Sequence, residues 1–374
     1  MIPELRKAYN EAFTPEKYQA FVQDLFSNPP GELDFRVAET PLFHALSEKA
    51  IPRHLRIPHE DAHPHCIVFD FGICTGADGT LEPQLIEMQG FPSLFAYQVL
   101  LPEVSARHFG KPKGLTNYLG GLDKEGYLAA LRRLILADED PKHVVLLELF
   151  PEQQKTRIDF AATKAYLGIE TVTARVEIRR IYNRLIFDLS QQPAEIQKQG
   201  KLLQEDLDVM WVPHPNWFYR LSKYTLPFIH HPNVPPTQFL RDVWKWPADM
   251  ENYVAKPLFS FAGQGVIVDV TREALEAIPD PENWILQRKV QYAAVIDTPD
   301  EPAKAEIRIF YFWEPGTPRP VPTNNLARLC KVKLVGVDYN KDKGWVIIPT
   351  PLCPWACRTF NNLLYRKTAP SWAG

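Results

Sequence analysis

The sequence predicts an α/β fold in which helices pack against mixed sheets. The chain has 374 residues, of which 45% are hydrophobic and 23% are charged, a composition typical of a folded globular protein with a sizeable core. Short apolar runs of strand type alternate with amphipathic helical segments along the middle of the chain, which favours an α/β arrangement. The 35 prolines are spread over the whole sequence, so we expect many short connections.

The first part of the chain, residues 1–65, is expected to form a helical arm. Thr14, Pro15 and Glu16 follow one another in the order of a helix cap, a first helical residue and an acidic first turn. Apolar residues at spacings of three and four come next, as they do on one face of a helix. We expect this arm to lie on the outside of the main fold.

Residues 66–210 predict a mixed α/β domain. It begins with a hairpin whose strands cover residues 67–71 and 84–88 and whose turn is rich in glycine and aspartate. Helices and strands then alternate. The sequence predicts helices at 93–108, 124–137, 152–167 and 194–206, and strands at 144–149 and 178–183.

Residues 211–374 predict a second unit in which strands dominate, with the boundary between residues 190 and 215. A helix over residues 217–226 is expected to open this unit. The strand patterns that follow lie at 254–257, 265–270, 284–290, 306–313, 327–334 and 345–348.

Charge and hydropathy exclude several classes of function. The 42 basic and 45 acidic side chains leave a net charge of −3, so no broad cationic surface is expected to bind nucleic acid. The longest apolar runs, such as residues 144–149 and 307–313, are far shorter than the ~20 residues of a membrane-spanning helix. The N-terminus lacks an apolar signal core and the five cysteines form no disulfide pattern. We therefore expect a cytoplasmic, reduced protein.

The most informative window for chemistry surrounds Lys256. A strand pattern delivers this lysine, and a loop with Gly263 and Gly265 follows. Glycines let backbone N–H groups approach an anion closely, and a lysine supplies a positive charge for phosphate oxygens. The loop is neither G-x-G-x-x-G nor a Walker sequence. An ordinary hairpin with an exposed lysine fits this window equally well.

Two flanking segments favour the phosphate-binding interpretation. Lys223 lies upstream on the expected helix, and the segment Gln287-Arg288-Lys289-Val290 lies downstream on a strand. In this order the pattern resembles the ATP-grasp superfamily, in which a helix lysine, a Lys-Pro strand, a glycine loop and a Gln-containing hinge hold ATP between two sheets. The resemblance implies that ATP phosphates contact Lys223 and Lys256. It also implies nucleotide contacts by the loop and the hinge, namely Ser260, Gly263, Gln264, Gly265, Gln287, Lys289 and Val290.

The acidic hairpin narrows this resemblance to one branch. Glu87-Met88-Gln89 lies far upstream of the lysines, on the strand that follows Asp70. This order is similar to that of the glutathionylspermidine synthetase and eukaryotic glutathione synthetase branch, and it implies that Asp70, Glu87 and Gln89 bind Mg²⁺. Magnesium prefers carboxylate oxygens together with water and phosphate. The alternative is that the acids are unconnected surface groups.

The sequence also departs from the pattern of this branch. Phe261 and Ala262 stand where the loop of the family has Arg and Glu, and Val68 stands where the family has an Arg two residues before the metal Asp. Gln89 replaces the Asn of the metal motif. A charged loop has thus become apolar, which leaves both the substrate and the ligase reaction open.

Arg308 completes the predicted site. It lies on a strand after the hinge, where ATP-grasp ligases commonly place an arginine that neutralises the transferring phosphoryl group. Its alternative role is a surface pair with Glu306. The resemblance implies a ligase that joins a carboxylate to an amine or a related nucleophile through an acyl phosphate, with ATP and Mg²⁺ as cofactors. The alternatives are a nucleotide-binding protein without ligase activity, acting as a sensor or partner, and an α/β binding module that takes no nucleotide.

The remaining candidates have weaker signals. A cluster of histidines with Cys66 suggests a transition-metal site, although its spacing matches no common motif. Asn183 and Arg184 end a strand, where they could equally reach the site or cap a helix. Arg328 could border the phosphate site or belong to a plain hairpin turn, and residues 152–156 could open a helix beside an acceptor pocket. Cys353 and Cys357 have the wrong spacing for a redox or zinc motif. The histidines of the cluster are His54, His59, His63 and His65.

Overall fold

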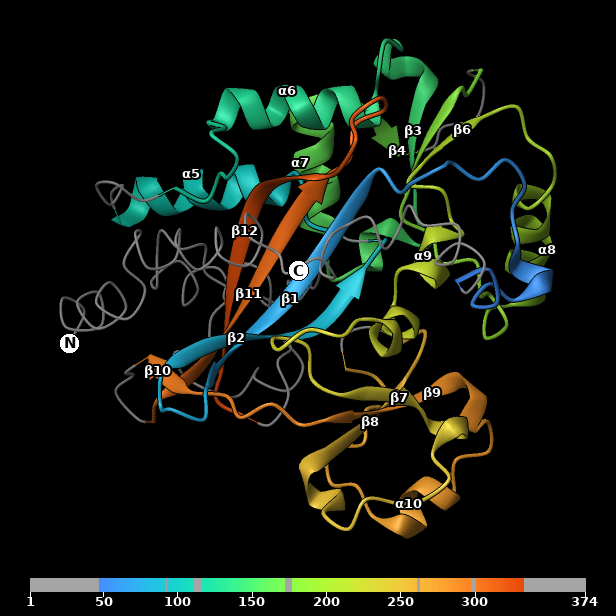
Figure 1. The fold of residues 1–374 in the computed structure, drawn as a ribbon. Coiled ribbons are helices and arrows are strands. Elements are labelled where there is room, and N and C mark those ends of the chain that lie inside the picture. The colour runs from blue at the N-terminus through green and yellow to red at the C-terminus, as the bar shows by residue number, and fades with distance from the viewer. Residues whose placement is uncertain are drawn as a thin grey trace, which may run out of the picture.

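A computed structural model describes residues 47–91, 93–109, 116–171, 177–260, 263–296 and 301–332. Three sheets form the framework of these residues (Figure 1). A long antiparallel sheet lies in the middle, a parallel sheet with several helices lies on one side of it, and a small antiparallel sheet lies on the other. The predicted α/β class is therefore confirmed.

The central sheet joins the predicted acidic hairpin to strands from much later in the chain. Strand β1 lies between β2 and β11, all antiparallel, and β12 and β10 both pair with β11. The predicted boundary at residue 210 therefore does not separate two independent sheets. The strands are β1 (Cys66–Thr75), β2 (Leu81–Gln89), β10 (Ala294–Ile296), β11 (Ala303–Phe312) and β12 (Val321–Cys330).

Strand β1 is buried on both faces, and its sequence shows why. Phe69 and Phe71 point to one face and pack in the core that contains Ile307 and Ile309 of β11. Val68 belongs to a second core on the opposite face. Because side chains alternate along a strand, Asp70 shares the face of Val68, so a carboxylate lies among otherwise apolar positions.

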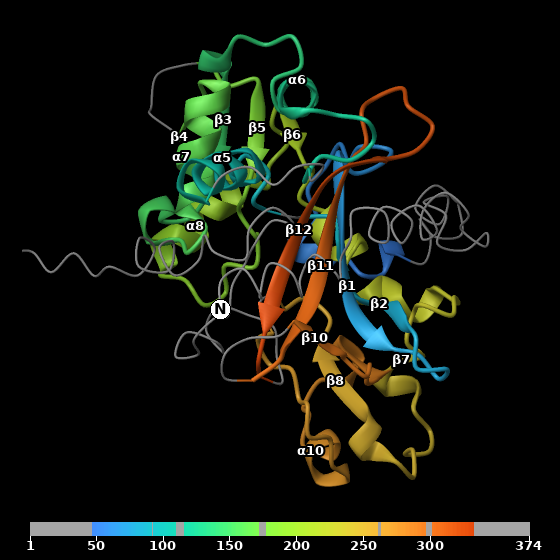
Figure 2. The ribbon, with the colours of Figure 1, turned by 90° about the vertical axis from the view of Figure 1, so that its left-hand side faces the viewer.

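The parallel sheet has the strand order β4-β3-β5-β6, and helices surround it (Figure 2). The predicted helix at 152–167 starts later than expected, because Gln154 is extended (ψ 138°) and separates a 3-10 turn, Pro151–Gln153, from α7. The elements are β3 (Val144–Leu147), β4 (Glu170–Thr171), β5 (Arg180–Asn183), β6 (Met210–Val212), α5 (Tyr97–Phe109), α6 (Lys124–Ile135), α7 (Arg157–Leu167) and α8 (Ala194–Leu203).

The small sheet has the order β7-β9-β8 and packs against α10. The prediction of a strand at 265–270 is wrong. Gly263 and Gly265 have φ values of +76° and +71°, so the chain turns there, and in this described stretch an isolated bridge between Ala255 and Ile267 takes the place of the strand. The elements are β7 (Thr237–Phe239), β8 (Tyr253–Pro257), β9 (Trp284–Arg288) and α10 (Arg272–Glu276).

The single helix predicted over residues 217–226 is also wrong. Helix α9 (Trp217–Arg220) ends at Leu221, whose φ of −105° and ψ of 83° are not helical. A 3-10 turn, Lys223–Phe228, follows, and Ser222 caps it by accepting a hydrogen bond from the backbone N–H of Tyr224 at 3.1 Å. Lys223 is therefore the first residue of a capped turn.

The described part of the predicted N-terminal arm packs into the main fold. Residues 47–65 contain a 3-10 turn, Arg53–Leu55, and Ala50, Ile51 and Leu55 join the core beneath β1. They are therefore not an outer arm. Among the described residues, no helix is long and apolar enough to cross a membrane. Outside the described residues lie 1–46 of the arm, the predicted strand at 345–348, and Phe261, Ala262, Cys353 and Cys357.

We predict that Gly90→Ala destabilises the fold. A Cβ atom at Gly90 would lie 2.6 Å from the carbonyl oxygen of Trp217 and 2.7 Å from Cβ of Leu221, and backbone cannot move away as a flexible side chain can. We expect a loss of about 1–3 kcal/mol in the free energy of unfolding, as for other overpacked sites, measured by denaturant titration.

Gly126→Ala is the matched control, because Gly126 lies in the first turn of α6 and the atoms nearest to its added Cβ belong to side chains. Alanine also favours a helix over glycine by about 1 kcal/mol. Equal destabilisation by both substitutions would show that the close approach at Gly90 is unimportant.

Candidate functional site

A buried carboxylate lies at the centre of the site. Asp70 on β1 is 2% exposed and stands opposite Arg308 of β11 in the strand register. Arg308 donates two hydrogen bonds to it, from Nε to Oδ1 and from Nη2 to Oδ2, each of 2.7 Å. Arg328 of β12 approaches Oδ2 to 3.0 Å. Burial raises the pKa of Asp70, but the two guanidinium groups outweigh it and hold the pKa below its ordinary value.

A second acid holds Arg328 from the other side. Nη2 of Arg328 lies 2.7 Å from Oε2 of Glu306, and the hydroxyl of Tyr292 donates to the other oxygen of Glu306. Burial, together with the nearby charge of Asp70, raises the pKa of Glu306 even though Arg328 opposes the shift. The pKa of Arg328 is raised, because its two acidic partners outweigh the effect of burial. Arg328 therefore stays charged between two acids.

Glu87 lies next to Asp70 on the edge strand β2 and pairs with a lysine. The strand register sets Glu87 opposite Asp70, but its side chain is 21% exposed. Nζ of Lys223 lies 2.8 Å from Oε1 of Glu87 and also donates to the carbonyl oxygen of Ser260. Lys223, which is only 5% exposed, therefore links the edge strand to the loop that follows β8.

Lys256 approaches the same edge from the small sheet. Its Nζ donates to Oε1 of Gln287 at 2.6 Å and to the carbonyl oxygen of Ile86 at 3.2 Å. Ile86 is the extra residue of a β-bulge between Leu85 and Glu87. Burial lowers the pKa of Lys256 to about 8, although Glu87 opposes the shift and the charge of Lys223 adds to it. The two lysines are therefore close enough to affect one another.

The structure brings most of the predicted site residues together, and it assigns some of them different contacts. The side chain of Gln287 is engaged by Lys256 and donates to Oγ1 of Thr237 at 2.9 Å, so it orients the lysine and is not free to contact adenine. Lys289 donates to the backbone oxygen of Glu251 at 2.6 Å, in an exposed position. Ser260 contributes its carbonyl group to Lys223. Gly263, Gln264 and Gly265 form the turn beyond Ser260, and Val290 follows β9 directly.

The charges of this cluster favour an anion. Lys223, Lys256, Arg308 and Arg328 are four cationic groups, whereas Asp70, Glu87 and Glu306 are three carboxyl groups. The pKa of Glu306 is raised and that of Asp70 is lowered, so Glu306 gains a proton more readily than Asp70 does. Since most of these groups are buried, an added negative charge meets little screening by water.

The three predicted magnesium ligands differ in how well each could bind a metal ion. Both oxygens of Asp70 are occupied by guanidinium groups, so Asp70 orients the arginines and does not fit as a ligand. Glu87 is accessible, and Gln89, two residues along β2, is partly exposed. Among the described residues, no three His, Cys, Asp or Glu side chains could hold a metal ion. One carboxylate with an amide fits Mg²⁺ that arrives bound to phosphates.

The histidine cluster does not assemble into a metal site. His63 stacks on Trp313 with ring centroids 4.3 Å apart, and His59 contacts Asp206 at 2.7 Å on the surface. His65 is buried with Nδ1 3.5 Å from Asp61, and burial lowers its pKa to about 3. These separate contacts argue against the transition-metal interpretation.

Arg184 lies at the carboxyl end of the parallel strand β5. Its guanidinium carbon is 5.1 Å from the ring centroid of Phe91, which follows β2 and contacts Phe218 edge to face. Glu148 follows the neighbouring strand β3, and burial raises its pKa although the charge of Arg184 opposes the shift. Asn183 accepts a hydrogen bond from the backbone N–H of Leu185 and forms a turn, not a helix cap. Ligands of α/β sheets commonly bind at this end of the strands.

Comparisons with known proteins define the class of fold. No family model and no curated protein matches the chain. Among solved structures, the chain is similar to the apo form of a glutathione synthetase-like effector, GSS30, from Globodera pallida, with a TM-score of 0.51 and 12% identity over 79% of this chain and 82% of that chain. This similarity shows that the chain shares the overall fold of that glutathione synthetase-like protein. The identity is too low to show the reaction.

Several contacts of the candidate site could not be predicted from the sequence. Arg328 reaches Asp70 only because β12 pairs with β11, and Tyr292 contacts Glu306 across the same sheet. The carbonyl oxygen of Ile86 becomes a lysine ligand through a bulge on an edge strand. The charged sequence Glu306-Ile307-Arg308, on a strand that continues with four apolar or aromatic residues, was a signal that could have indicated a buried ionic network.

We predict that Asp70→Asn destabilises the protein far more than Glu87→Gln. Loss of Asp70 takes the carboxylate away from Arg308 and leaves Arg328 to Glu306, and breaking a buried pair in this way costs about 3–5 kcal/mol. Loss of Glu87 affects one pair, in which Glu87 is 21% exposed and Lys223 keeps its hydrogen bond to the carbonyl oxygen of Ser260. Denaturant unfolding in the absence of divalent metal measures both. Similar small losses would contradict the anchoring role of Asp70.

We predict that Lys256 titrates near pH 8, below the ordinary lysine value of 10.5. Because the folded state binds this proton less tightly than the unfolded state, the group reduces stability below pH 8, and the reduction disappears as the pH rises through the ordinary value. The ¹³Cε resonance of Lys256 measures the titration. In Glu87→Gln the midpoint moves lower, since Glu87 raises the pKa. A midpoint near 10.5 would contradict the buried environment.

Proposed function

We propose that this protein is an ATP-dependent ligase that joins a carboxylate to an amine. The observation that carries the proposal is the convergence of Lys223 and Lys256 on one edge of the central sheet, beside Glu87 and the paired arginines. Two lysines from separate elements supply the charge that a triphosphate requires. The similarity in fold to a glutathione synthetase-like protein supports the same class of chemistry.

The internal ion pairs suggest how a nucleotide binds. Lys223 is neutralised by Glu87, so a triphosphate must replace Glu87 as the partner of this lysine. The released carboxylate would then face phosphate oxygens, which is unfavourable unless a cation lies between them. Glu87 and Gln89 would hold Mg²⁺ at this position, where it supplies charge neutralisation to the phosphates. We therefore propose that ATP binds together with its metal.

Arg308 and Arg328 are proposed to stabilise the phosphoryl group during transfer. Asp70 fixes Arg308 through two hydrogen bonds, and Glu306 fixes Arg328. Each guanidinium has five N–H donors, so both retain donors beyond those that the acids accept. Groups that are already oriented need no reorganisation when charge develops in the transition state.

The proposed reaction has two steps and needs no covalent enzyme nucleophile. A carboxylate oxygen of the substrate attacks the terminal phosphorus of ATP, which releases ADP and forms an acyl phosphate. The amine then attacks the acyl carbon, phosphate leaves with the bonding electrons, and the amine loses a proton to give the amide. Positioning and charge neutralisation account for such transfers.

The carboxyl end of the parallel sheet is proposed to bind the organic substrates. Arg184 supplies a positive charge for a carboxylate, and Glu148 a group that could accept a proton from an amine. Phe91 connects this region to the phosphate site, because it contacts Arg184 and follows the strand that carries Glu87. A small molecule with both carboxyl and amino groups fits this arrangement.

We predict that the protein binds Mg²⁺–ATP and that Lys223→Met and Lys256→Met each weaken binding by about tenfold or more, the loss expected for a charged hydrogen bond. Calorimetry measures the affinity. Lys245→Met is the matched control, because Lys245 is exposed on the loop after β7, and its affinity should equal that of the unchanged protein. In Glu87→Gln, ATP affinity should depend less on Mg²⁺.

Turnover distinguishes the ligase from its alternative. The assay measures ADP and phosphate release over a panel of amino acids and polyamines, and hydroxylamine traps any acyl phosphate as a hydroxamate. Hydroxamate formation that requires Lys256 supports the ligase. ATP binding without turnover on any substrate would instead favour a nucleotide-binding sensor or partner protein, and absence of binding would overturn both.

A further inference from the structure

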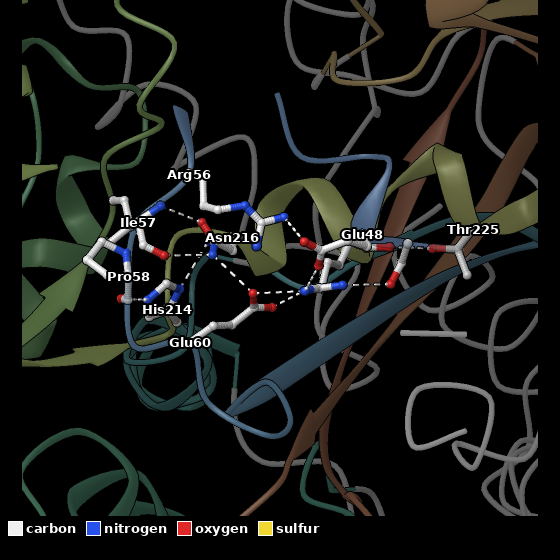
Figure 3. Close-up of polar contacts among 10 residues, drawn as sticks. Glu48, Arg56, Ile57, Pro58, Glu60, His214, Asn216 and Thr225 are labelled. Carbon is white, nitrogen blue, oxygen red and sulfur yellow. Dashed lines mark hydrogen bonds and ion pairs between the residues drawn. The ribbon is translucent and has the colours of Figure 1, made fainter. Parts of the chain in front are cut away.

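One carboxylate, Glu60, contacts both ends of the short helix that precedes Lys223 (Figure 3). At the start of α9, Nδ2 of Asn216 donates to Oε2 of Glu60 at 3.0 Å. At its end, Arg220 donates to the same carboxylate from Nε, and from Nη2 at 2.9 Å. Three donors from two helix positions therefore converge on Glu60.

Arg220 is enclosed by further groups from the same N-terminal segment. Its Nη2 lies 2.6 Å from Oε2 of Glu48, and its Nη1 donates to Oγ of Ser47 at 3.1 Å. Arg220 is only 5% exposed, so these partners replace the water that a guanidinium normally contacts. Burial alone lowers the pKa of Arg220, and the hydrogen bonds and charges of Glu60 and Glu48 outweigh it and leave a net rise.

The helical conformation of α9 stops between Arg220 and Lys223. Leu221 and Ser222 have non-helical dihedral angles. The carbonyl oxygen of Arg220 accepts a hydrogen bond from Oγ1 of Thr225 at 2.8 Å, and that of Leu221 accepts one from the N–H of Gly90. A shift of Arg220 would therefore move the capped turn whose first residue is Lys223.

We propose that Glu60 is a positioning residue, which fixes Lys223 beside Glu87 through its bonds to Arg220 and Asn216. Residues 47–60 are then an integral part of the site and not a separate arm. The effect on Lys223 is independent of any ligand, whereas its importance for ATP rests on the proposed function above. A purely structural Glu60 would affect global stability without a selective effect on Lys223.

The test compares three acid-to-amide substitutions. Glu60→Gln turns one oxygen into an NH₂ group that faces the donors of Arg220 and Asn216, so we expect the largest effect. Glu48→Gln keeps the three hydrogen bonds to Glu60 and should fold even if the first variant does not. Asp206→Asn is the matched control. Asp206 is the exposed partner of His59, which precedes Glu60 in the chain, and the substitution removes its charge without altering a contact of Arg220.

The first readout is acetylation of Lys223, followed by mass spectrometry without nucleotide, with Lys245 as internal reference and the melting temperature as a measure of global stability. In Glu60→Gln we expect labelling of Lys223 to rise about tenfold, the effect expected when a charged hydrogen bond is lost. The rise should be smaller in Glu48→Gln and absent in Asp206→Asn. Labelling of Lys223 that stays unchanged in both glutamate variants, or that rises equally at Lys245, overturns the inference.

The second readout is the affinity for Mg²⁺–ATP, which separates the two proposals. A loss of affinity that follows the labelling order of the variants supports both. Selective labelling of Lys223 in a protein that never binds Mg²⁺–ATP supports the positioning role and overturns the proposed function. Unchanged Lys223 labelling together with normal ATP binding overturns only the positioning role.

Discussion

The structure depends on one buried ionic interaction, the carboxylate of Asp70 shared by Arg308 and Arg328. A carboxylate at this depth is strongly unfavourable unless its charge and its oxygens are both satisfied. The two arginines come from adjacent strands, so the interaction ties the register of β1, β11 and β12 together. A slip by one residue would carry the charges onto the face where Phe69 and Ile309 pack.

The candidate site lies along the edge strand β2, next to the buried ionic interaction of Asp70. Strand β2 has an outward edge with no neighbouring strand in the central sheet, and segments from elsewhere in the described chain use its polar groups. Lys256 binds the carbonyl oxygen of Ile86, and Leu85 donates its N–H to the carbonyl oxygen of Asn233 at 2.7 Å. Covering the edge in this way both protects it from pairing with another chain and places the lysines beside Glu87.

Local patterns in the sequence were sufficient for the acidic hairpin and for the lysine on β8, because each depends on neighbouring residues. They were not sufficient for Arg328, whose contact with Asp70 requires pairing between strands far apart in the chain. Nor did they indicate the break at Leu221, since leucine is a good helix former and tertiary contacts override that preference here. The role of Gln287 depends on which lysine its strand faces, which a motif cannot specify.

During biosynthesis, the central sheet cannot form completely until its last strands have been made. Asp70 and Arg308 are 238 residues apart, and the parallel sheet and the small sheet both lie between them in the chain. The hairpin therefore leaves the ribosome with its acid unpaired and its apolar faces uncovered, until residues up to Arg328 have emerged. Pairing between strands so far apart in the chain is slow. We therefore expect chaperones that shield exposed strands to bind the nascent chain.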